Sequence, residues 1–178
     1  MNPVRQILRA ATARHHQRVD AAFAGFDLAD AGSYRAFLSA HARVLPTVEN
    51  AIGLPWTGWT RRAPLLLRDL SDLGVLPPPL AKNLPKMEPA AQWGCLYVLE
   101  GSRLGGSMLA RRVGAELPRR YLSAGHTDGS WQAFQDALEA AAEPAVAAWI
   151  DIAAAAARSV FEMFEDSARL ELGHVRGR

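Results

Sequence analysis

Three glycines stand inside a segment near the middle of the chain that otherwise has a helical pattern. The segment runs from Tyr97 to Met108, and its apolar residues recur at close to helical spacing. Gly101, Gly105 and Gly106 lie within it. Each glycine costs a helix interior about 1 kcal/mol relative to alanine. A helix that keeps all three therefore needs bare backbone at this place.

The spacing of these glycines leaves two interpretations open. Gly101 and Gly105 are four residues apart, so they lie on one face of a helix. A flat ligand against this bare strip of main chain would account for them, and so would close packing of a second helix. Glycine clusters are also places where helices bend.

The remainder of the chain predicts helices and no strands. No stretch alternates convincingly between apolar and polar residues, and no internal repeat is visible. We expect a single all-α domain over residues 1–178 with six or so helices. Pro46 is expected to kink or shorten the second helix, and Pro118 to end the fourth. The expected helices cover about 3–24, 33–48, 61–73, 88–117, 130–142 and 143–172.

Composition excludes several classes of protein. No apolar run among the 178 residues approaches the roughly 20 residues of a membrane span, and the first five residues lack the apolar core of a signal peptide. The net charge is only +2, and the basic residues are dispersed without the interleaved aromatic residues of a nucleic-acid surface. Cys95 is the only cysteine, so no internal disulfide forms. We therefore expect a cytoplasmic protein that binds neither membranes nor nucleic acid.

Two adjacent histidines in the first expected helix are candidate ligands. Neighbouring residues on a helix point about 100 degrees apart, so His15 and His16 do not share one ligand. A helical projection puts His15 in the middle of the apolar stripe and His16 at its edge. A histidine at such an edge suits a cofactor that covers it, and a structural role is the alternative. A di-iron site is not expected, because Glu171 and His174 form the only Glu-x-x-His motif.

The segment from Leu8 to Asp20 resembles the N-terminal motif of heme oxygenases, which reads Leu-basic-x-x-Thr-x-x-x-His followed by an acidic residue. The glycine segment resembles the distal helix of the same family. Three further motifs resemble its bacterial branch: Trp59-x-x-Arg62, the segment from Leu67 to Gly74, and the segment from Phe161 to Glu165. The resemblance extends over nearly the whole chain.

This resemblance implies an all-α fold that holds heme between the first helix and a kinked distal helix. Heme would be both cofactor and substrate, cleaved to biliverdin, carbon monoxide and ferrous iron. The reaction uses O2 and electrons from a separate donor such as a ferredoxin or reductase. The matching positions make His16 the iron ligand and make Arg9 and Tyr97 contacts of the heme propionates. Gly101, Gly105 and Gly106 would bring bare backbone to the oxygen side of the heme.

One residue departs from the pattern of the mammalian-type members. Arg103 stands at about the position of their distal aspartate. A guanidinium stays charged and does not relay protons by titrating, so we expect Arg103 to turn away from the iron, toward solvent or a propionate. The missing aspartate favours an alternative, a heme-binding carrier or sensor without turnover. A non-heme helical enzyme that uses Cys95 is a third possibility.

Overall fold

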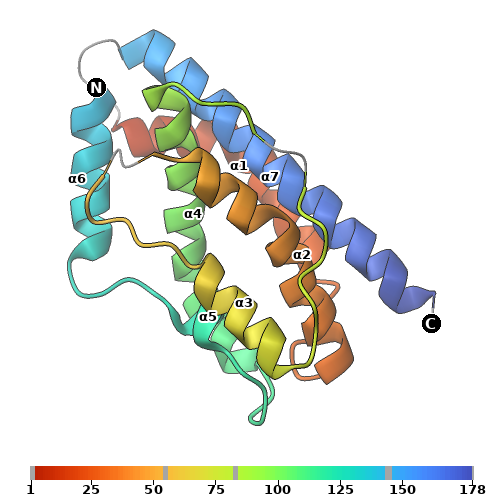
Figure 1. Cartoon of the computed structure of the whole chain (residues 1–178). Helices are drawn as coiled ribbons and strands as arrows, with labels where there is room; N and C mark the ends of the chain where they lie inside the picture. The colour runs from red at the N-terminus through yellow and green to blue at the C-terminus, as the bar shows by residue number, and fades with distance from the viewer. Residues whose placement is uncertain (1–2, 54–55, 82–83, 143–145, 178) are drawn as a thin grey trace.

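The computed structural model describes residues 3–53, 56–81, 84–142 and 146–177. Their regular structure is helical, and no strand occurs within these ranges, which confirms the expected all-α class (Figure 1). The helices are α1 (Val4–Phe23), α2 (Ala31–Ala51), α3 (Ala63–Asp72), α4 (Pro89–Leu109), the 3-10 turn η1 (Ala110–Arg112), α5 (Arg120–Ser123), α6 (Ser130–Ala142) and α7 (Val146–Arg176).

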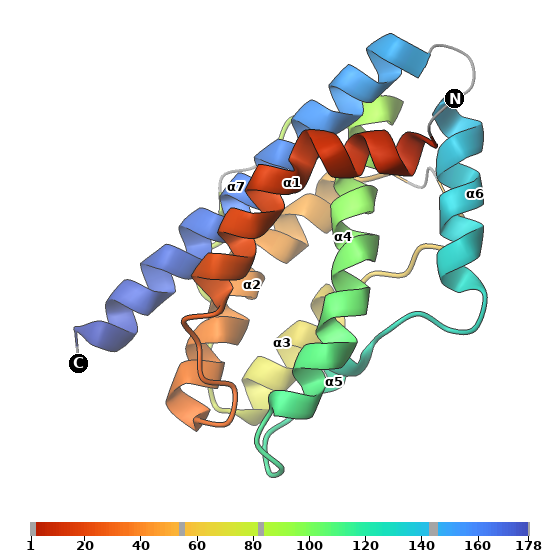
Figure 2. The ribbon, with the colours of Figure 1, turned by 180° about the vertical axis from the view of Figure 1, so that it is seen from behind.

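The longest helix, α7, forms the spine of the fold. It packs against α1, α2 and α4, and it crosses the whole molecule in both views (Figures 1 and 2). Its buried small residues, Ala153, Ala154 and Ala157, let neighbouring helices come close. At Gly94 of α4, an added Cβ would overlap the backbone carbonyl of Ala153. Gly94 is therefore the glycine that close packing of α4 on α7 requires.

The helix starts and interruptions differ in part from expectation. Asp30 caps α2, because its side chain accepts a hydrogen bond of 2.7 Å from the backbone N–H of Ser33, which was the expected cap. Pro46 does not shorten α2, which continues to Ala51. The fifth predicted helix, over residues 130–142, is α6, and it has the predicted bounds.

The predicted fourth helix is too long. α4 and η1 end at Arg112, not at Leu117 before Pro118. Val113 adopts an extended backbone, and the N–H of Gly114 donates to the Leu28 carbonyl at 3.2 Å, so a tertiary contact draws the chain away from the helix axis. The glycine segment itself does not break α4.

The last helix, α7, extends further toward the C-terminus than expected. α7 continues to Arg176, past the predicted end at Leu172, and the predicted start of this helix at residues 143–144 lies outside the described residues. Within the described residues, no helix is both long enough and apolar enough to cross a bilayer.

Candidate functional site

A cavity of about 660 Å³ lies between α1 and α4, with further walls from α2, α5 and α7. Residues from both ends of the chain line it, and most of them are apolar or aromatic. This size and character are typical of a site for a small organic ligand. Its lining includes Arg5, Arg9, His16, His41, Arg62, Tyr97, Gly101, Ser102, Gly105, Gly106, Tyr121, Leu122, Trp131 and Phe161.

His16 lines this cavity, and its neighbour His15 does not. The Nδ1 atom of His16 is 3.0 Å from Oδ2 of Asp20, one helical turn on, and the His16 side chain is 61% exposed. Its ring meets Phe161 of α7 edge-on, with 5.6 Å between ring centroids. His15 faces α7 instead, where its Nε2 is 3.3 Å from Glu162. The adjacent histidines therefore have different environments.

The Asp20 contact engages one of the two ring nitrogens of His16 and leaves the other available. A neutral imidazole that donates Nδ1–H to a carboxylate keeps the lone pair of Nε2 free, and such carboxylates commonly orient ligating histidines. Phe161 of α7 also contacts the ring. His16 thus has the geometry of a single nitrogen ligand at the edge of an apolar cavity.

On the opposite helix, the glycine segment faces empty space. A Cβ added at Gly101 or Gly105 would meet no other atom within 4 Å, leaving the helix's own backbone aside. At Gly106, a Cβ would lie 3.3 Å from the Leu122 carbonyl oxygen, so this glycine also serves the packing of α4 on α5. Helix packing therefore accounts for the glycine at position 94 and partly for the one at position 106. It does not account for Gly101 and Gly105.

Basic groups gather at one part of the cavity wall. Arg5 and Arg9, one turn apart on α1, line it together with Tyr97 of α4. Burial raises the pKa of Tyr97, while the positive charges of Arg9 and Arg5 oppose the rise, so the three groups lie close enough to interact. Such a cluster suits the carboxylates of a ligand. Sequence reasoning missed Arg5, although its spacing from Arg9 would have indicated it.

Two further polar side chains line the cavity: His41 of α2 and Arg62, which precedes α3. Burial lowers the pKa of His41 to about 4, and its Nδ1 is 2.9 Å from the Phe37 carbonyl oxygen. This ring is therefore neutral at pH 7, with Nδ1–H donating to that carbonyl. Arg62 donates to the Leu99 carbonyl at 2.8 Å and to Ser102 Oγ at 2.6 Å. The sequence placed His41 on an apolar helix face without indicating a role in the site.

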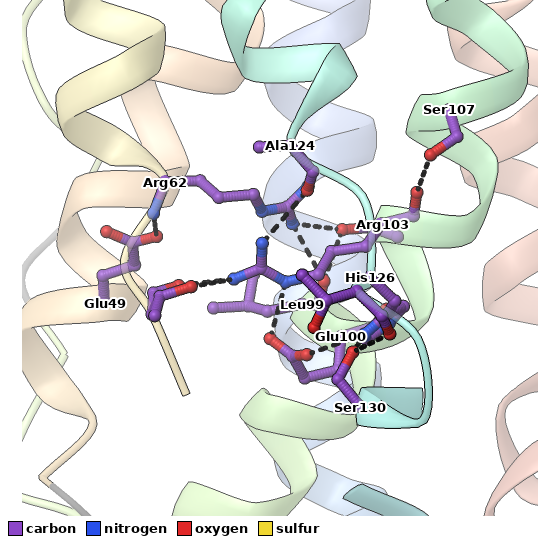
Figure 3. A network of polar contacts seen from close by, with 12 residues as sticks. Glu49, Arg62, Leu99, Glu100, Arg103, Ser107, Ala124, His126 and Ser130 are labelled. Atoms are coloured by element: carbon purple, nitrogen blue, oxygen red, sulfur yellow. Dashed lines mark hydrogen bonds and ion pairs between the residues drawn. The ribbon is translucent and has the colours of Figure 1, made fainter. Parts of the chain in front are cut away.

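Arg103 faces away from the cavity, as expected, but its predicted surroundings are wrong. It is only 6% exposed and reaches neither solvent nor the ligand cavity. Its Nε donates to Glu100 at 2.9 Å, and its Nη atoms donate to the carbonyls of Ala124 and Thr60 (Figure 3). A buried guanidinium needs such partners, and the sequence analysis predicted none of them.

Cys95 has no place in this site. It is buried and does not line the cavity, and burial raises the pKa of its thiol to about 12. The thiol is therefore protonated and not nucleophilic at pH 7, which removes the alternative of a cysteine enzyme. In the described part of the chain, no group of three or more His, Cys, Asp or Glu side chains could hold a bare metal ion.

Comparison with known proteins identifies the family of the chain. No profile of a protein family matches the sequence. A heme oxygenase of Xanthomonas campestris pv. campestris (strain 8004) is 36% identical over 136 residues, which cover 66% of this chain and 79% of that protein. The NO- and CO-bound heme oxygenase of Neisseria meningitidis has a similar structure, with a TM-score of 0.79 and 26% identity over 97% of this chain and 94% of that one. The chain belongs to the heme oxygenase family.

Proposed function

We propose that the cavity between α1 and α4 is the place where this chain binds and degrades heme. The observation that carries the proposal is that His16 and the two unobstructed glycines, Gly101 and Gly105, line one cavity from different helices. Heme is flat and largely apolar, takes an axial nitrogen ligand and carries two carboxylates. The apolar walls, His16, and the cluster of Arg5, Arg9 and Tyr97 fit these features in turn.

Family membership supplies the reaction. Heme oxygenases degrade heme with O2 and a reductant, and heme is their substrate as well as their prosthetic group. The chain is accordingly an enzyme, and we propose biliverdin, carbon monoxide and ferrous iron as its products. When bound, heme supplies the iron at which O2 reacts. Nothing in the comparisons supports a heme carrier without turnover.

The residues of the chain bind the substrate and shape the space above it. His16 holds the iron through Nε2, and Arg9, Arg5 and Tyr97 hold the propionates. Gly101 and Gly105 keep side chains out of the oxygen side, so that water molecules fit beside the backbone there.

Proton delivery must proceed without a carboxylate at position 103. Arg103 is turned away, and the ring of His41 is neutral at pH 7 because burial lowers its pKa to about 4. Neither group is set up to give up a proton by titrating. We assign proton delivery to water molecules held by backbone carbonyls around Gly101–Gly105.

The proposal also covers the electron donor, the domain organisation and the cellular compartment. The electron donor is a separate protein such as a ferredoxin or reductase. The chain acts as one domain over residues 1–178, since α1 and α7 from its two ends line the same cavity. It acts in the cytoplasm, where a buried free thiol such as Cys95 is usual.

The decisive experiment is turnover of bound heme. The purified protein is loaded with one equivalent of hemin and given ascorbate or a reductase in air, and the visible spectrum is recorded. We expect the heme absorption to fall while that of biliverdin rises, with release of carbon monoxide. A stable hemin complex that yields no biliverdin with either donor would contradict the proposal and favour a carrier.

A further inference from the structure

Two side chains from outside α4 hold two successive backbone carbonyls just before Gly101, the first glycine of the glycine segment. Arg62 donates to the carbonyl of Leu99 at 2.8 Å, and Nε2 of His126 lies 3.0 Å from the carbonyl oxygen of Glu100 (Figure 3). The next residue is Gly101. Of the two, His126 does not line the cavity itself; it reaches the site through α4 and through Trp131, which lines the cavity and packs on the His126 ring.

The partners of the His126 ring determine where its proton sits. A carbonyl oxygen only accepts hydrogen bonds, so Nε2 carries the hydrogen. Nδ1 is 3.2 Å from Ser130 Oγ and 3.7 Å from the Glu100 carboxylate. The Ser130 hydroxyl either donates to Nδ1 or donates to the Thr127 carbonyl, 2.8 Å away, and accepts from a protonated Nδ1. The bond from Nε2–H to Glu100 therefore forms whether the ring is neutral or charged.

The surroundings hold the His126 ring in place. Its side chain is only 8% exposed, and its ring packs on Trp131 with 5.2 Å between centroids. Arg103 fixes the Glu100 carboxylate beside the ring and ties α4 to the carbonyl of Ala124, two residues before His126. The ionic group beside the ring is thus the Glu100 carboxylate, which is itself paired with Arg103 of the same helix. This arrangement attaches the loop ahead of α6 to the side of α4 that faces away from the cavity.

We propose that His126 is a positioning residue for the glycine segment of α4. Gly101 and Gly105 have no contacts on the cavity side, and glycines weaken a helix, so the backbone there is held from the opposite side. His126 provides that hold at the residue before Gly101. The inference rests on the function proposed above, because the glycine segment matters to catalysis only if heme lies against it.

Amide hydrogen exchange in the heme-free protein tests the proposal. His126→Leu removes the donor at similar size, and His126→Gln keeps an N–H near the position of Nε2. Ser130→Ala is the matched control, because it removes the partner of Nδ1 and the local bond to the Thr127 carbonyl but leaves the bond from Nε2 to Glu100 in place. We expect exchange at residues 101–106 to rise about tenfold in His126→Leu, which corresponds to loss of one buried hydrogen bond. His126→Gln and Ser130→Ala should stay within about twofold of the wild type.

Hemin titration then links the position of the helix to the site. His126→Leu should bind hemin more weakly than His126→Gln, with the histidine-ligated spectrum retained in both. Unchanged exchange at residues 101–106 in a folded His126→Leu variant would overturn the inference. If that variant does not fold, the wild type still decides the question, because ¹⁵N NMR that shows Nε2 of His126 without a hydrogen would also overturn it.

The two proposals fail in different ways. If the wild type does not bind hemin, the proposed function is refuted. The exchange measurement uses no hemin and judges the hydrogen bond of His126 by itself.

Discussion

Replacing Gly105 by leucine should stabilise the heme-free protein and at the same time block heme binding. A Cβ at this position meets no atom of another element within 4 Å, and the longer leucine side chain extends from there into the cavity that Gly105 lines. Leucine in a helix interior is favoured over glycine by close to 1 kcal/mol. For a domain of this size, that gain raises the melting temperature by about 2–4 °C. The leucine then occupies the space in which the proposal places heme.

The contrast with Gly94 makes this prediction specific. A Cβ at Gly94 would overlap the backbone carbonyl of Ala153, and backbone yields less easily than a side chain. Gly94→Ala should therefore destabilise the protein by about 3 kcal/mol, the upper part of the usual range for overpacking. The two glycines lie on the same helix and should respond with opposite signs.

Thermal unfolding followed by circular dichroism gives the stability of each variant, and titration with hemin gives its affinity. We expect Gly105→Leu to melt above the wild type and to bind hemin at least about 100-fold more weakly, equivalent to about 2.7 kcal/mol. If Gly105→Leu melts well below the wild type, or binds hemin normally, Gly105 serves helix packing and the reasoning is wrong.

Three further predictions follow from the polar groups of α1, α2 and α4. Arg103→Ala should cost about 3–5 kcal/mol in urea unfolding, because it leaves the buried carboxylate of Glu100 without its cation; a loss below 1 kcal/mol would show that water replaces the partner. Burial lowers the pKa of His41 to about 4, so its contribution to stability is complete above about pH 6.5 and is lost as the pH falls toward 4, by about 3 kcal/mol in total. His41→Gln should lack this part of the pH dependence, and an unchanged profile would contradict the assignment. Arg9→Gln should weaken hemin binding roughly tenfold but leave binding of hemin dimethyl ester unchanged, since the ester has no carboxylates; equal losses for both ligands would argue against a propionate contact.

The sequence predicted the helical fold well where local signals decide the structure. The bounds of α6 follow from its apolar spacing, and Gly74, with a φ of 68°, ends α3 as a left-handed glycine should. The end of α4 was wrong because a tertiary contact, from Gly114 to Leu28, stops the helix before the local signal at Pro118. Local patterns do not contain such contacts.

Some residues of the candidate site were also predictable from the sequence, and others depend on the tertiary structure. The glycine pair was recognisable because a spacing of four residues puts both on one helix face, whereas His16 was selected over His15 only by the resemblance to the family motif. His41 escaped notice because an apolar helix face offers no sign that a cavity lies above it. Gly94 and Gly105 look alike in the sequence, and only the position of α7 shows that one packs against a helix while the other faces empty space.

A titration of the purified protein with hemin, followed by absorption spectroscopy, tests the central claim most directly. The wild type should bind one equivalent and show the spectrum of histidine-ligated ferric heme. His16→Ala should lose that spectrum, and His15→Ala should keep it, because His15 faces Glu162 outside the cavity. The account is contradicted if the wild type forms no such complex, or if His15→Ala loses the spectrum while His16→Ala retains it.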